Sequence, residues 1–118
     1  MAEREAGLND LPAKVKVGYH DYKIETWHPS EASGARRYGE TNGISRTIRI
    51  DTSFSPRQTA ETLLHEILHC ICDIWNIEDE DKEERVVSAM SAGLATVWRD
   101  NPDVLSFIDM NLLAKPVE

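Results

Sequence analysis

Two histidines stand four residues apart in the segment 60–73, and a glutamate directly follows the first of them. They form an H-E-x-x-H motif made of His65, Glu66 and His69. If the segment is a helix, residues four apart lie one turn apart on the same face, so both imidazoles can reach one point in space. That geometry suits two ligands of a tetrahedral zinc ion. Glu66 lies about 100° round the helix from His65, where it can contact a water bound to the ion.

This pattern predicts the hydrolysis of peptide bonds by a zinc-activated water. A catalytic zinc keeps three protein ligands and one open position for water, whose pKa the metal lowers. Glu66 then acts as the general base, which takes the proton of the water and hands it to the leaving amine. The oxyanion that develops needs the zinc and one further donor. Four side chains are candidates for that donor, namely Tyr19, Tyr22, Tyr38 and His28.

The residues around the motif predict the helix that it requires. Ser55 and Pro56 are typical of a helix start, and apolar residues then recur at helical spacing. Relative to His65, His69 lies at about 40° and Asp73 at about 80°, so the polar residues share a wall outside the apolar arc. Asp73 either orients the imidazole of His69 as a hydrogen-bond acceptor or is a solvated helix residue. The apolar positions are Ala60, Leu63, Leu64, Ile67, Leu68, Ile71, Ile74 and Trp75.

The segments that flank the motif resemble those of a known family. The sequence RTIRID before it is expected to form a strand, and KEER after it to open a second helix. In this order and spacing, residues 44–102 resemble the minimal zincins of the gluzincin type, in particular the ImmA/IrrE-like metallopeptidases and small phage-encoded HExxH proteins. The resemblance implies a strand at the edge of the cleft and a third zinc ligand, a glutamate from the next helix. Of the E-A-N-x-F-A pattern of the ImmA-like group, only Glu84 and Ala89 fall at matching positions.

Two glutamates at the start of the second helix are candidates for this third ligand. Helical phase favours Glu83, which lies about 40° from the middle of the apolar arc, whereas Glu84 lies about 140° away. The register of the family favours Glu84, because Val86, Ala89 and Met90 then take the apolar positions that follow the ligand. We predict Glu84 as the third ligand, with Glu83 as the alternative.

The other histidines and the cysteines have simpler interpretations. No histidine follows His69, which excludes zincins that take a third histidine from farther along the chain. His20 and His28 lie upstream and are expected to be surface residues rather than ligands. Cys70 and Cys72 lie two apart on the motif helix and point to different sides, so they cannot form a disulfide with each other. Free cysteines are typical of a cytoplasmic protein.

The composition fits one small acidic domain. The chain has 118 residues, of which 41% are hydrophobic, and carries a net charge of −8. That charge argues against binding to nucleic acid, which needs a basic surface. No apolar run is long enough to span a bilayer, and the first residues lack the apolar stretch of a signal peptide. We therefore expect a cytoplasmic protein with a protein or peptide substrate, a flexible tail at residues 1–10 and a single domain at 11–118.

Strand patterns come first and helical patterns later, which predicts an α+β fold with a small, mostly antiparallel sheet. One hairpin is expected at residues 14–27, a loop at 28–37, and a second hairpin around the turn signal Asn42-Gly43. In that hairpin Ile44, Ile48 and Ile50 are strand-like, and SRTIRID is expected to be the edge strand that holds a substrate by strand addition. Two helices should follow the motif helix, at residues 81–99 and 102–114. The apolar side of the first of these two consists of Val86, Val87, Met90, Leu94 and Val97.

Two functions fit these features. The first is a zinc-dependent peptidase in which Glu66 is catalytic. The second is a catalytically silent, zinc-stabilised protein-interaction module, since so short a chain leaves little surface for a substrate cleft. An intact Glu66 favours the enzyme, because a zinc ion with a purely structural role has no use for a general base.

Overall fold

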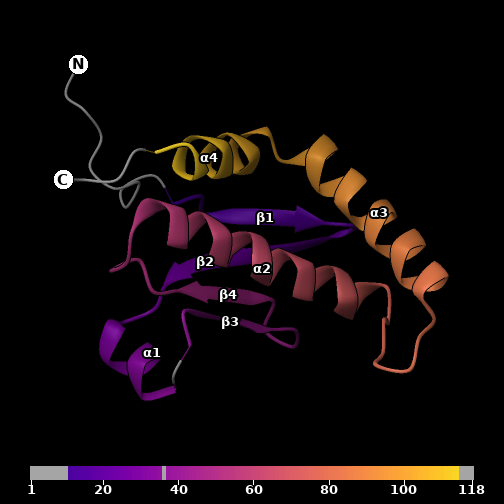
Figure 1. The fold of residues 1–118 in the computed structure, drawn as a ribbon, viewed down its shortest axis with the longest axis horizontal. Helices are drawn as coiled ribbons and strands as arrows, with labels where there is room; N and C mark the ends of the chain where they lie inside the picture. Colours follow the sequence, from indigo (N-terminus) through magenta and orange to yellow (C-terminus); the bar gives the residue numbers. More distant parts are fainter. Residues whose placement is uncertain (1–10, 36, 115–118) are drawn as a thin grey trace.

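The computed structural model describes residues 11–35 and 37–114, and this part of the chain is an α+β fold (Figure 1). The predicted fold class is confirmed, while the predicted tail at residues 1–10 lies outside the described residues. Within the described part, no helix is long and apolar enough to cross a membrane. In chain order the elements are β1 (Lys14–Val17), β2 (His20–Thr26), α1 (Pro29–Ala35), β3 (Gly39–Asn42), β4 (Thr47–Ile50), α2 (Pro56–Ile74), α3 (Glu83–Asp100) and α4 (Pro102–Leu112).

The strands form one mixed sheet in the order β1-β2-β4-β3. β1 and β2 form one antiparallel hairpin and β3 and β4 form another, and the two hairpins join where β2 runs parallel to β4. The segment SRTIRID contains β4, so the prediction that it is the edge strand is wrong. Its backbone is paired on both sides, with β2 and with β3. The edge strand of the second hairpin is instead β3.

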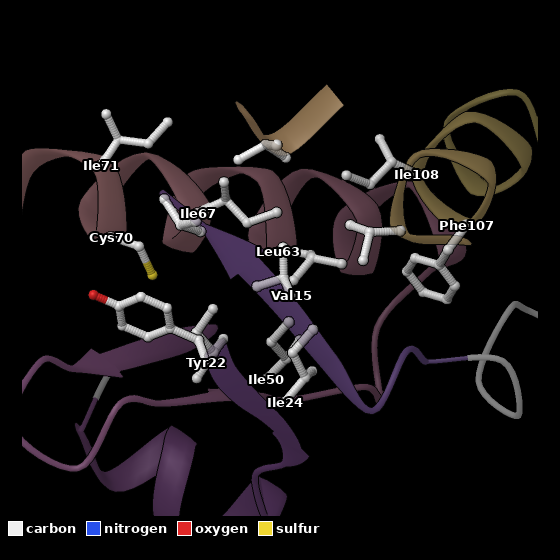
Figure 2. Packing of buried hydrophobic residues seen from close by; sticks show 14 residues of the cluster. Val15, Tyr22, Ile24, Ile50, Leu63, Ile67, Cys70, Ile71, Phe107 and Ile108 are labelled. Atoms are coloured by element: carbon white, nitrogen blue, oxygen red, sulfur yellow. The ribbon is translucent and has the colours of Figure 1, made fainter. Parts of the chain in front are cut away.

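α2 packs across one face of the sheet, and alternate strand residues point toward it. In β1, Lys14 and Lys16 are exposed whereas Val15 and Val17 are buried, as the two-residue period of a strand requires. The apolar stripe of α2 covers these residues, and α4 completes the core beside α2 (Figure 2). The core cluster consists of Val15, Val17, Tyr22, Ile24, Ile48, Ile50, Leu63, Ile67, Cys70, Ile71, Val97, Val104, Phe107 and Ile108.

The end of α3 covers the outer edge of β1. The backbone N–H of Lys16 donates to Asn101 Oδ1 over 2.8 Å, and Asn101 Nδ2 donates to the carbonyl of Lys16 over 2.7 Å. The N–H of Gly18 donates to the hydroxyl of Thr96 over 3.1 Å. These side chains bind the backbone groups that a further strand would otherwise use. Asn101 itself is buried, so its amide is matched by this pair of bonds rather than by water.

The buried side of α3 is smaller than the sequence pattern indicates. Its buried residues are Ala89, Gly93 and Val97, and Val87, which was expected on the apolar side, is 54% exposed. A Cβ at Gly93 would lie 2.5 Å from Cγ2 of Ile71. Small residues therefore let α3 approach α2 closely, and the bulkier Val87 falls outside this contact.

Two predicted connections differ in the structure. Residues 29–35 form α1 rather than a loop, and they begin with a proline, which is favourable at the first position of a helix. Ile44 is fully exposed and lies in the turn between β3 and β4. Asn42 Oδ1 accepts from the backbone N–H groups of Ile44 and Ser45. The connection is therefore a longer turn organised by Asn42, and not a two-residue Asn-Gly turn.

Tyr22 of β2 lies fully buried beneath α2, and its hydroxyl points toward the sulfur of Cys70 (Figure 2). This hydroxyl has no partner in close hydrogen-bond geometry among the described residues, and Asp73 is the nearby group that acts on it both as a charge and as an acceptor. Burial first, with the nearby Cys70 and Asp73 adding to it, raises the pKa of Tyr22 from 10 to about 12. The folded protein thus holds a phenol proton that the unfolded chain releases more easily.

We expect the free energy of unfolding to fall as the pH rises through the window from 10 to 12. The contribution of Tyr22 to the free energy of unfolding is fully present below pH 10, because its hydroxyl is protonated there in both the folded and the unfolded state. The loss of this contribution is on the order of 2 kcal/mol. Urea unfolding measured at a series of pH values tests this. Tyr22→Phe removes the titrating hydroxyl and should make the alkaline fall shallower. Part of the fall should remain, because burial also raises the pKa of Cys70 from 9 to about 12. An equally steep fall in Tyr22→Phe would contradict the prediction.

Candidate active site

The motif lies on α2, as its sequence context predicts. The helix begins at Pro56, and the hydroxyl of Ser55 accepts from the backbone N–H of Gln58 over 3.2 Å as its N-cap. This capping fixes where the helix starts. The motif therefore falls in the middle turns of α2, where the helix is held by its apolar face against the sheet.

The polar wall of α2 faces a cavity of about 700 Å³ between this helix and the edge strand β3. The four residues that the sequence places on one wall, His65, Glu66, His69 and Asp73, all line this cavity. Their common location is thus confirmed. The opposite wall is formed by residues of β3 and its two ends, namely Arg37, Tyr38, Gly39, Glu40, Thr41 and Gly43.

The two imidazoles of the motif converge at this cavity. Nε2 of His65 and Nε2 of His69 lie 3.1 Å apart, and the ring centroids are 4.8 Å apart. Two ligands of a tetrahedral zinc with bonds of 2.0–2.1 Å lie about 3.3 Å from each other. Both rings are exposed, so solvent and solutes reach them. The pair therefore fits two neighbouring positions around one zinc ion.

Glu66, an acidic residue, is buried beside this pair. Its side chain is 5% exposed, and its Oε1 accepts a hydrogen bond from the hydroxyl of Thr41 over 2.6 Å. A Cβ at Gly39 would lie 2.7 Å from Cγ2 of Thr62 and 3.3 Å from Oε2 of Glu66. β3 thus holds the carboxylate in place and, by having glycine at 39, leaves room for it.

Comparison of the chain with family models, curated proteins and solved structures finds no match. The likeness to minimal zincins therefore depends on the motif, its helix and the strand edge beside it. The motif and its helix are present in the described residues, whereas the strand at the edge of the cavity is β3 and not RTIRID, so the resemblance stays a prediction.

The third predicted ligand is not brought to the histidine pair. Glu83 and Glu84 begin α3 and are both exposed, and neither lines the cavity. Glu84 Oε2 instead accepts a hydrogen bond of 3.4 Å from the hydroxyl of Ser88, one turn along α3. Among residues 11–35 and 37–114, no three His, Cys, Asp or Glu side chains are grouped closely enough to hold a metal ion. A ligand role for Glu84 therefore requires the first turn of α3 to approach α2.

We expect Glu84→Ala to weaken zinc binding by more than about tenfold, since even the loss of a residue that only supports a ligand weakens binding by 10–100-fold. Glu83→Ala, its matched control on the same exposed turn, should leave zinc affinity near that of the wild type. Competition with a chromogenic zinc chelator measures both affinities. The reverse order would assign the role to Glu83, and equal affinities in both variants would exclude α3 as the source of the ligand.

The structure distinguishes between the four candidates for a second oxyanion donor. Tyr38 lines the cavity, whereas Tyr22 lies in the core and Tyr19 is 95% exposed in the turn between β1 and β2. His28 lies before α1, where its Nδ1 is 2.7 Å from the hydroxyl of Ser30. Tyr38 is therefore the one member of this set that lines the same cavity as the histidine pair among the described residues.

The remaining histidine and the two cysteines lie outside the cavity. His20 begins β2 and does not line it. Cys70 is buried in the core, Cys72 is half-buried, and both are free, as predicted. Two residues that do border Glu66, Gly39 and Thr41, were missed by the sequence analysis. Their spacing from the motif carries no signal, because only the pairing of β3 with β4 places them beside α2.

Proposed function

We propose that the protein is a zinc-dependent metallopeptidase that hydrolyses peptide bonds with Glu66 as general base. The observation that carries this proposal is the pair of imidazole nitrogens 3.1 Å apart, in the same cavity as a buried carboxylate. His65 and His69 would hold the zinc, with Glu84 as the proposed third ligand. The free thiols of Cys70 and Cys72 support a location in the cytoplasm, which keeps thiols reduced.

Glu66 is well placed to move a proton. When bound, zinc would lower the pKa of a water and polarise the carbonyl of the substrate. Because Oε1 of Glu66 is engaged by Thr41, Oε2 would be the oxygen that takes a proton from water and passes it to the leaving amine. The hydrogen bond and the burial of Glu66 reduce the number of orientations that its carboxylate can adopt, so it is oriented before the reaction begins.

The edge of β3 supports the binding of an extended substrate. The N–H of Asp51 donates to the carbonyl of Tyr38 over 2.8 Å, so this opposed pair is a hydrogen-bonded one. Such pairs alternate along an antiparallel ladder, and the pair Gly39–Ile50 is therefore of the other kind. The backbone N–H and C=O of Gly39 and Thr41 consequently point away from β4 and toward an added strand.

The second candidate function is a catalytically silent, zinc-stabilised interaction module. It is favoured by one observation, namely that Glu84 does not line the cavity. The buried position of Glu66 and its hydrogen bond to Thr41 favour the enzyme, because a zinc ion with a purely structural role does not need a general base beside it.

Metal analysis of the purified protein, together with an unbiased peptide-cleavage screen, tests the proposal. We expect about one zinc per chain and cleavage that stops when the metal is removed by a chelator. A protein that takes up no zinc when dialysed against it would contradict the proposed site. Stoichiometric zinc without cleavage of any peptide would favour the interaction module.

A further inference from the structure

The cavity is a groove that runs along α2. Its lining on α2 extends from Gln58 to Asp73, a rise of about 22 Å at 1.5 Å per residue. Across it, Gly39 faces Thr62 and Gly43 faces Asp73, so β3 and α2 run in the same direction. At about 3.3 Å per residue, this length accommodates six or so residues of an extended peptide.

One end of the groove is lined by Tyr38, and Phe54, which is not part of the lining, packs against it. Tyr38 and Phe54 pack edge to face with their ring centroids 4.8 Å apart, and they are 49% and 45% exposed. Exposed aromatic rings beside a cavity favour contact with a large apolar side chain. Arg37 and Glu61 line the same end and have opposite charges, so this end has no net charge from them.

The other end carries a carboxylate. Asp73 is exposed and lines the groove, and a Cβ at Gly43 would lie 2.8 Å from its Oδ2. Because glycine has no Cβ, Gly43 leaves room for the carboxylate of Asp73. None of the ion pairs of the described residues includes Asp73, whereas Glu40, another acidic residue of the groove, is paired with Arg49. Within the described residues Asp73 therefore has no ion-pair partner, although it also interacts with the buried hydroxyl of Tyr22, on which Arg46 acts as well.

We propose that the groove selects peptides with a basic side chain at the Asp73 end and a large apolar side chain at the Tyr38–Phe54 end. This inference rests on the proposed function, since it places the reacting bond over the histidine pair. The middle of that pair lies about 9 Å along α2 from Asp73, so the basic residue stands about three positions from the bond. Antiparallel addition to β3, the slightly more stable mode, puts the basic residue on the N-terminal side of the bond and the apolar residue on the C-terminal side.

The test measures binding, so that it does not depend on hydrolysis. Zinc-loaded Glu66→Gln protein is titrated with fluorescent octapeptides of a serine and alanine background. The reference peptide carries Lys three positions before the central bond and Phe three positions after it, and companions carry Glu in place of Lys, Ser in place of Phe, or the two in reverse order. We expect the reference peptide to bind about fivefold tighter than the peptide with Glu, as an exposed ion pair allows, and tighter than the other two.

Variants assign each preference to its end of the groove. Asp73→Lys should reverse the preference for Lys over Glu, whereas Glu31→Lys, the same charge change at an exposed residue of α1 outside the groove, should leave it in place. Phe54→Ser should remove the preference for Phe alone. Melting curves of each variant establish that it is folded. If Asp73→Lys does not fold, Asp73→Asn takes its place in the binding test.

Each outcome decides between the proposals. A preference that Asp73→Lys leaves unchanged, equal binding of the reversed peptide, or no binding of any peptide would overturn this inference. If the wild type cleaves peptides without these preferences, the proposed function stands and the inference falls. If the preferences are found but the wild type cleaves nothing, the inference stands and the peptidase proposal falls.

Discussion

Glu66→Gln is expected to keep both the fold and the zinc while it lowers peptide hydrolysis by about 10²–10⁴-fold. The amide cannot accept the proton of the attacking water. Gln has nearly the same shape, and its Oε1 can still accept the hydrogen bond from Thr41 that holds Glu66 in place. The loss should therefore appear in kcat and leave the melting temperature unchanged.

Glu61→Gln is the matched control for this result, because Glu61 lines the same cavity but is exposed on the preceding turn of α2. We expect it to hydrolyse peptides nearly as fast as the wild type. Initial rates with one peptide from the cleavage screen, measured at equal zinc content, compare the three proteins. If Glu66→Gln cleaves as fast as the wild type, Glu66 is not the base.

His65→Ala and His69→Ala are each expected to lose the zinc and to lower the Tm of the zinc-loaded protein. A metal that binds only the folded state at a thousand times its dissociation constant contributes about 4 kcal/mol. For a domain of this size, the loss of that contribution lowers the Tm by on the order of 10 °C. Zinc content and melting curves of the dialysed proteins measure both effects.

His20→Ala provides the control, because this histidine lies at the start of β2 and does not line the cavity. It should keep its zinc and its Tm. After removal of the metal by a chelator, all four proteins should melt at similar temperatures, because the difference comes from the metal. Full zinc occupancy in both His65→Ala and His69→Ala would remove the basis of the proposed site.

The part of the site on α2 could be predicted because its signals are local. The apolar period fixes which face of the helix is buried, and the spacing of His65 and His69 then places both imidazoles on the other face. The burial of Glu66 could not be predicted in this way. The helical wheel places it outside the apolar arc, and it is buried because β3 covers it with Gly39 and Thr41.

The strand segments could be predicted from the alternation of apolar and polar residues, but the order of the strands in the sheet could not. An internal strand and an edge strand of four residues show the same pattern, so nothing local distinguishes Thr47–Ile50 from Gly39–Asn42. The parallel pairing of β2 with β4 makes β4 internal, and this pairing joins segments that are distant in the sequence. For the same reason, the hydrogen-bond partners of Thr41 and Asn101 could not be predicted from the sequence.

The closure of one side of the sheet by Asn101 and Thr96 has a consequence for self-association. Lys16 and Gly18 already have hydrogen-bond partners on that side, so among the described strands β3 is the more open edge for a strand from another molecule. Two copies that pair through β3 leave no further strand free, and growth stops at a dimer instead of continuing to a fibre. Such a dimer would also cover both histidine pairs, so any activity would fall as the protein concentration rises.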